Sequence, residues 1–80
     1  MANDLQKNID KIHTTEMGRE RIKQNLVLKA DINAVDWCKQ KITQSNDIVR
    51  TGKNWYVSTI DCVITVNVYS YTIITAHKRK

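Results

Sequence analysis

The chain has no proline, no phenylalanine and only two glycines among its 80 residues. Disordered segments and flexible linkers are rich in chain breakers or poor in apolar residues, whereas 41% of this sequence is hydrophobic. A chain of this length has room for one small core, which predicts a single folded domain over residues 1–80. Without phenylalanine, every aromatic contact must come from Trp37, Trp55, Tyr56, Tyr69 and Tyr71.

Long apolar runs are absent as well. No stretch reaches the roughly 18 apolar residues that a membrane span needs, and the first residues, MANDLQKNIDK, are charged where a signal peptide is apolar. Cys38 and Cys62 have no partner at the spacing of metal ligands, so we expect two reduced, buried thiols. These features predict a cytoplasmic protein with no membrane contact, no metal and no cofactor.

The charge of the chain is strongly basic. The formal net charge is +5 at pH 7 and the sequence pI is about 9.4. Such a balance favours anionic partners such as RNA, DNA or an acidic protein surface. Arg50 and Lys53 flank a glycine-containing turn, and Lys78 and Arg79 lie near the end of the chain. The alternative is that the charge serves solubility alone.

The composition changes near residue 47, from charged, helix-forming sequence to sequence rich in Ile, Val and Thr. Branched side chains suit a pleated sheet, so the chain is predicted to be α+β. Two to three helices within residues 1–46 are expected to pack on one face of a four-stranded antiparallel sheet within residues 47–78. Because no linker-like stretch divides the two parts, we interpret them as layers of one domain.

The apolar spacing predicts a short first helix, a second helix ending near residue 26 and a third ending near residue 43. His13 follows the first helix, where we expect it to make a helix-boundary contact. The residues expected to cap the second and third helices are Thr14 or Thr15, and Asp31 or Asn33. The residues expected in the core are Leu5, Ile9, Ile12, Met17, Ile22, Leu26, Val35, Cys38 and Ile42.

Four strands are expected at residues 48–51, 55–60, 61–67 and 71–78, with Trp55 in the core and Tyr56 partly exposed. We place Asn67 opposite Tyr71 in the second hairpin. The residues that then face the helices are Cys62, Ile64, Val66, Thr72, Ile74 and Ala76. The residues of the opposite, open face are Asp61, Val63, Thr65, Asn67, Tyr71, Ile73, Thr75 and His77.

His77 is the residue of this open face best suited to acid–base catalysis, because histidine titrates near neutral pH. In the expected register Asp61 lies directly opposite His77, Thr75 lies beside it, and Tyr71 lies further along the strand. The cations expected to hold nucleic-acid phosphates at the rim of this face are Arg50, Lys53, Lys78 and Arg79. The alternative is an ordinary solvated sheet face with a solubilising tail.

Four segments of the chain are distinctive: IHTTEMGRERIKQNL, VDWCKQKI, GKNWYV and ITVNVYSYTIITAHK. Together they resemble a family of short bacterial proteins known only as a domain of unknown function, and GKNWY and SYTIITAHK are the most specific parts. The resemblance implies a shared fold. The order of elements is also similar to that of ribonuclease toxins of the RelE and barnase–colicin–EndoU type. That likeness implies a catalytic role on the exposed sheet face for His77, Thr75 and Tyr71.

Three hypotheses of function follow from these features. The first is a small basic nucleic-acid-associated protein, toxin-like or a degenerate endoribonuclease, in which His77 acts as general acid or base. The second is a non-enzymatic inhibitor or adaptor that binds a nucleic-acid enzyme. The third is a structural homodimer whose second copy covers Val63 and Ile73. Whether the chain is an enzyme stays open at this point.

Overall fold

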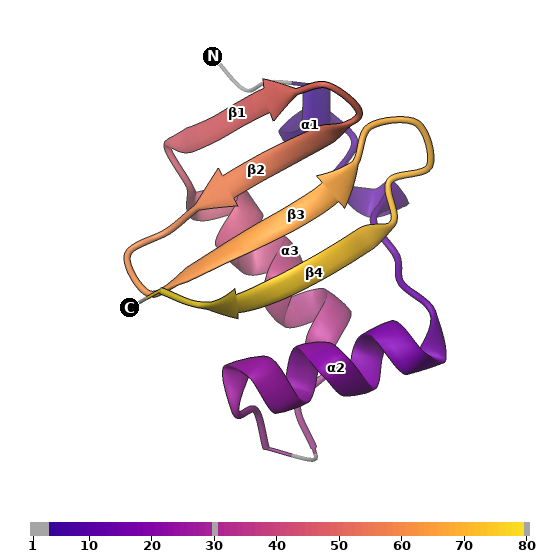
Figure 1. Ribbon diagram of the computed structural model, residues 1–80, viewed down its shortest axis with the longest axis vertical. Helices are drawn as coiled ribbons and strands as arrows, with labels where there is room; N and C mark the ends of the chain where they lie inside the picture. Colours follow the sequence, from indigo (N-terminus) through magenta and orange to yellow (C-terminus); the bar gives the residue numbers. More distant parts are fainter. Residues whose placement is uncertain (1–3, 30, 80) are drawn as a thin grey trace.

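The computed structural model describes residues 4–29 and 31–79, and its helices precede its strands. The helices are α1 (Asp4–Lys7), the 3₁₀ helix η1 (Ile9–Lys11), α2 (Glu16–Leu26) and α3 (Ala34–Gln44). The strands are β1 (Asp47–Thr51), β2 (Asn54–Ser58), β3 (Cys62–Asn67) and β4 (Ile73–Lys78). Figure 1 shows α3 behind the sheet and α2 alongside β4. The predicted α+β fold with a four-stranded antiparallel sheet is confirmed.

The two longer helices begin where short polar side chains cap them. Thr15 Oγ1 accepts a hydrogen bond from the Gly18 amide at 2.9 Å, and Asn33 Oδ1 accepts one from the Asp36 amide at 3.0 Å. Each bond satisfies an amide that has no partner within its helix. The first expected helix is instead split into α1 and η1, after which Ile12 has extended backbone. Within the described part of the chain, no helix is long and apolar enough to cross a membrane.

Replacing Asn33 by alanine is expected to lower the free energy of unfolding by about 1 kcal/mol, because the Asp36 amide loses its acceptor. The thermal midpoint, measured by circular dichroism, should then fall by about 4–8 °C. Thr43→Ala is the matched control. The Thr43 hydroxyl donates back to the Lys39 carbonyl on the exposed surface of α3, so alanine should be neutral or stabilising there. A larger loss from Thr43→Ala than from Asn33→Ala would contradict the capping role.

The sheet is a meander in which neighbouring strands follow the chain order β1, β2, β3, β4. Gly52 occupies the β1–β2 turn with a φ of +62°, which glycine adopts without a steric penalty. Strand β2 ends at Ser58 rather than at residue 60, because the Thr59 amide turns to donate to the Cys62 carbonyl at 2.9 Å. The turn of residues 59–61 therefore projects beyond the sheet.

The expected register of the second hairpin is wrong. His77 pairs with Val63 and not with Asp61, so the pairing is displaced by two residues of β4. The β3–β4 turn, in which Tyr71 adopts a left-handed φ of 58°, accounts for one residue of this displacement, because Val66 pairs with Ile73 and not with Thr72. The Asn67 side chain caps this turn by accepting hydrogen bonds from two of its amides. The turn is thus longer than the one that would bring Asn67 and Tyr71 into a pair.

A β-bulge also changes which residues of β4 face the helices. The register shifts between Thr65 and Val66: Thr65 pairs with Thr75, whereas Val66 pairs with Ile73, so Ile74 is the extra residue. Ile73 is buried and Ile74 is exposed, the reverse of the expectation. Ile73 therefore belongs to the core and cannot be part of an apolar patch on the open face.

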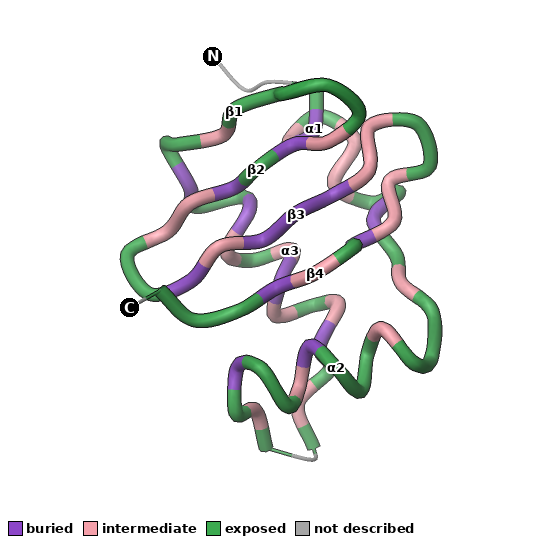
Figure 2. Tube along the Cα trace, in the orientation of Figure 1, coloured by how far each residue is buried: buried purple, intermediate pink, exposed green. Residues whose placement is uncertain are grey.

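The core lies between the helices and the inner face of the sheet, and Figure 2 shows its buried residues on β2, β3 and α3. Trp55 is 5% exposed and Tyr56 is 39% exposed, which confirms the predicted orientation of both rings. Met17 was expected in the core but is 70% exposed. Helix α2 packs through Ile22 and Leu26, and Met17 lies roughly 140° around the helix from Ile22.

Helix α3 contributes Ala34, Cys38 and Ile42 to the core, whereas Val35, also expected there, is only half-buried. Cys38 and Cys62 are free thiols and both are buried, as the sequence predicts. Burial among apolar side chains disfavours the thiolate, so neither thiol is poised as a nucleophile.

Candidate functional site

Three of the residues singled out in the sequence lie on the open face of the sheet. Thr75 and His77 point away from the helices, because Ala76 between them is buried in the core. Thr65 lies on the same face between the core residues Ile64 and Val66, but it is itself buried, with 6% exposure. Thr75 lies directly opposite Thr65. His77 lies opposite Val63, and Asp61 lies in the turn before β3, so the expected pairing of imidazole and carboxylate across the sheet does not form.

Tyr71 does not belong to the open face. Its ring lies 5.3 Å from that of the buried Trp55, and the Lys11 ammonium lies 5.6 Å from the Tyr71 ring centroid. The side chain is half-buried against the core. The structure therefore separates Tyr71 from Thr75 and His77, with which the sequence had grouped it.

The four predicted cations divide between the two ends of the sheet. Arg50 and Lys53 lie at the β1–β2 turn, and Lys78 and Arg79 lie where β4 ends. The two ends are separated by the length of a strand of five or six residues, about 17–20 Å. All four residues are exposed. Two separate basic regions thus replace the single predicted rim.

The basic region at Lys78 and Arg79 contains an open groove of about 700 Å³. In Figure 1 the end of β4 lies beside the β2–β3 turn, and the Arg79 amide donates to the Asp61 carbonyl at 3.1 Å. Helices α2 and α3 supply the other wall. The residues that line this "end groove" are Leu26, Trp37, Ile60, Asp61, Lys78 and Arg79. A cationic and an acidic side chain thus share a partly apolar surface.

Lys41 on α3 links the aromatic and acidic groups of the end groove. Its ammonium lies 3.3 Å from Asp61 Oδ2 and 5.2 Å from the ring centroid of Trp37. Asp61 Oδ1 accepts a hydrogen bond from the Thr59 hydroxyl at 2.9 Å. The hydrogen bond from Thr59 and the nearby Lys41 ammonium lower the pKa of Asp61 below its ordinary value. Asp61 is therefore an ionised acceptor at neutral pH, held in place from two sides.

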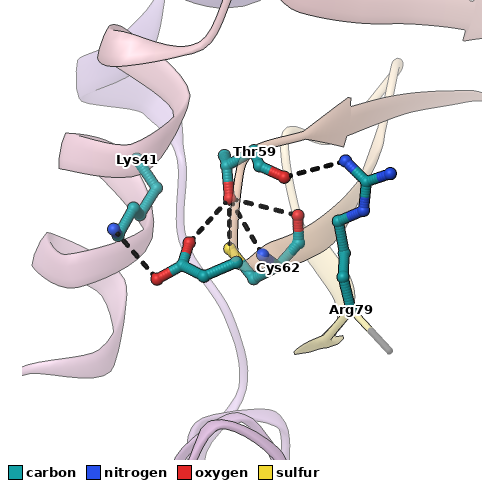
Figure 3. Close-up of polar contacts among 5 residues, drawn as sticks. Lys41, Thr59, Cys62 and Arg79 are labelled. Atoms are coloured by element: carbon teal, nitrogen blue, oxygen red, sulfur yellow. Dashed lines mark hydrogen bonds and ion pairs between the residues drawn. The ribbon is translucent and has the colours of Figure 1, made fainter.

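Thr59 and Arg79 fix the shape of the turn itself, as Figure 3 shows. The Thr59 hydroxyl accepts from the Cys62 amide at 3.0 Å and lies 3.0 Å from the Cys62 thiol. The Arg79 guanidinium donates to the Thr59 carbonyl at 3.0 Å. A turn held by so many bonds presents Asp61 and the exposed Ile60 in one arrangement.

The end groove combines an indole ring, two exposed cations and one oriented carboxylate. Cations attract phosphate groups, the indole offers a stacking surface, and the carboxylate accepts hydrogen bonds. Sequence reasoning found Lys78 and Arg79 but missed the contributions of Trp37 and Lys41. No spacing pattern points to this group, because its members come from α2, α3, the β2–β3 turn and the end of β4.

His13 has a structural position at the edge of the sheet. Its amide donates to the Tyr71 carbonyl at 3.2 Å and its carbonyl accepts from the Ile73 amide at 2.8 Å, forming a one-residue bridge beside β4. The ring nitrogens lie 2.9 Å from the Lys11 carbonyl and 3.1 Å from the Thr72 hydroxyl. These contacts anchor the segment between η1 and α2, so His13 does more than mark a helix boundary.

Comparisons with known proteins bear on the whole chain. The family described as "Protein of unknown function (DUF3781)" matches residues 6–77, from α1 almost to the end of β4. Neither a curated protein nor a solved structure matches the chain. The expected resemblance to a domain of unknown function is thus confirmed, and the likeness to ribonuclease toxins stays a prediction. The chain belongs to the DUF3781 family of proteins of unknown function.

Proposed function

We propose that this protein is a small nucleic-acid-associated protein that binds single-stranded RNA in its end groove. The observation that carries the proposal is the presence of Trp37, Lys78 and Arg79 in one groove. Proteins hold unpaired bases by stacking them on aromatic rings, while cations neutralise the backbone phosphates. The groove volume of about 700 Å³ falls within the range of roughly 300–1,000 Å³ that is usual for ligand sites.

A second depression, of about 360 Å³, extends the end groove past the β2–β3 turn. Both hollows are lined by Ile60 and Arg79, and Lys41 lines the second one. The two hollows therefore meet at Ile60 and Arg79, with Lys78 lining the first and Lys41, which is paired with Asp61, lining the second. Such a surface suits a strand of several nucleotides better than an isolated small anion.

The proposal is tested by fluorescence anisotropy of a labelled single-stranded RNA at 50 and 200 mM salt. We expect salt-sensitive binding by the natural protein. The double variant Lys78→Ala, Arg79→Ala should bind at least about tenfold more weakly, and its plot of log affinity against log salt should be shallower by about 1.4. The charge-matched control is Arg50→Ala, Lys53→Ala at the other end of the sheet, which should keep most of the affinity.

Three outcomes of this experiment would contradict the proposal. The first is absence of binding, and the second is equal losses from the two double variants, which would indicate unspecific attraction. The third is RNA cleavage that disappears in His77→Ala, which would assign the activity to the open sheet face. A mass measurement on the same samples detects a homodimer, which the exposed Val49 and Tyr56 of that face would favour.

A further inference from the structure

We propose that the end groove selects guanine, with the base stacked on Trp37, its Watson–Crick edge donating to the Asp61 carboxylate, and its phosphate held by Lys78 and Arg79. This inference rests on the proposed RNA binding and deepens it. Uniform attraction of a phosphate chain requires cations alone. The Asp61 carboxylate, which lines the groove, adds an acceptor that a hydrogen-bond donor of the ligand can use.

Asp61 has acceptor capacity to spare. Its two oxygens each accept one interaction, from the Thr59 hydroxyl at 2.9 Å and from the Lys41 ammonium at 3.3 Å. An ionised carboxylate offers about four lone-pair sites, so each oxygen can accept another hydrogen bond. The side chain is 53% exposed and lines the groove, which leaves those sites open to a ligand. The ionised form persists at neutral pH, because Thr59 and Lys41 lower the pKa of Asp61.

Guanine is the base whose edge fits a carboxylate. It presents two adjacent donors, the ring N1–H and the exocyclic N2 amine, which match the two carboxylate oxygens in a bidentate pair. Adenine and cytosine place an acceptor beside their single amine, and uracil places carbonyls on both sides of its N–H. Those acceptors would face the negative carboxylate, so the site discriminates against the three other bases.

Lys41 fixes the position of the Asp61 carboxylate relative to the Trp37 ring. Its ammonium contacts the Asp61 carboxylate and lies over one face of the Trp37 ring at 5.2 Å, so one side chain orients both, and the base stacks on the part of the ring that lines the groove. The cations that face a phosphate, Lys78 and Arg79, lie in the same groove. A pre-arranged set of this kind loses little conformational entropy when a nucleotide binds.

The test compares mononucleotides as competitors of a labelled single-stranded RNA. Guanosine monophosphate should compete at least about tenfold better than adenosine monophosphate, the discrimination that one bidentate contact to a base provides. Inosine monophosphate, which keeps N1–H but lacks the N2 amine, should fall between the two. The variant Asp61→Asn should lose the preference for guanine while still binding adenosine monophosphate, because phosphate and stacking contacts remain. Asp10→Asn on η1, outside the end groove, is the charge-matched control and should keep the preference.

Failure of the guanine site and failure of RNA binding give different results in this experiment. Binding of RNA with equal competition by guanosine and adenosine monophosphates overturns the guanine site and leaves RNA binding standing. A full guanine preference in Asp61→Asn overturns the role of the carboxylate. Absence of RNA binding by the natural protein overturns both proposals together.

Discussion

Replacing Trp55 by alanine is expected to cost about 3–5 kcal/mol of the free energy of unfolding. Trp55 is 5% exposed, pairs with Val66 in the central part of the sheet, and contacts the Tyr71 ring at 5.3 Å. A domain of this size has a total stability of about 4–12 kcal/mol, so the variant loses a large fraction of it. The thermal midpoint measured by circular dichroism should fall by at least about 12 °C.

Trp37→Ala is the matched comparison, because it removes the same side chain from a half-buried position on α3. We expect a clearly smaller fall of the thermal midpoint, together with loss of RNA binding, since the stacking surface of the end groove is gone. Trp55→Ala should therefore lose more stability than Trp37→Ala. The molecules of Trp55→Ala that remain folded should nevertheless bind RNA better than Trp37→Ala does. A larger destabilisation by Trp37→Ala would show that the core is centred elsewhere.

The parts of the fold that local rules govern could be predicted from the sequence. Asparagine and threonine side chains cap helix amides in the first turn, and both Thr15 and Asn33 do so here. Alternation along a strand places neighbouring residues on opposite faces, which correctly buried Trp55 and exposed Tyr56. These inferences succeed because each depends on residues only a few positions apart.

The pairing of β3 with β4 could not be predicted from the same rules. Tyr71 adopts a left-handed conformation that is uncommon for a residue with a side chain, and the bulge adds Ile74 to one strand. Both features lengthen the path of the chain and shift every later pair. A displacement of two residues was enough to place Val63 opposite His77 in place of Asp61, so the predicted catalytic pair does not form.

The end groove escaped prediction for a different reason. Its residues are close only because the end of β4 returns to the β2–β3 turn and α3 packs behind that turn. Lys78 and Arg79 could be singled out by charge, but their neighbours Trp37 and Asp61 depend on tertiary packing alone. A single sequence carries no spacing signal for contacts of this kind.

Alkaline pH is expected to destabilise the protein through its buried cysteines. Burial, reinforced by the negative charge that a Cys62 thiolate would carry, raises the pKa of Cys38 from 9.0 to about 12. Burial likewise raises the pKa of Cys62, although the contact with the Thr59 hydroxyl opposes the shift. In the unfolded chain both thiols ionise near their ordinary pKa. Between about pH 9 and 12 the folded state therefore keeps protons that the unfolded state has released.

The sign of the effect follows from that difference in bound protons, because stability falls with rising pH wherever the folded state binds more of them. The contribution of the protonated Cys38 thiol to the free energy of unfolding is complete below pH 9 and is lost towards pH 12. At roughly 1.4 kcal/mol for each pKa unit, the total loss is about 4 kcal/mol. Urea unfolding at pH 7, 9, 10 and 11 measures the loss. Cys38→Ala should lose clearly less over this range, while the ionisation of lysines and tyrosines affects both proteins alike. Identical pH profiles for the two proteins would mean that the Cys38 thiol ionises without unfolding, which requires water to reach the core between α3 and the sheet.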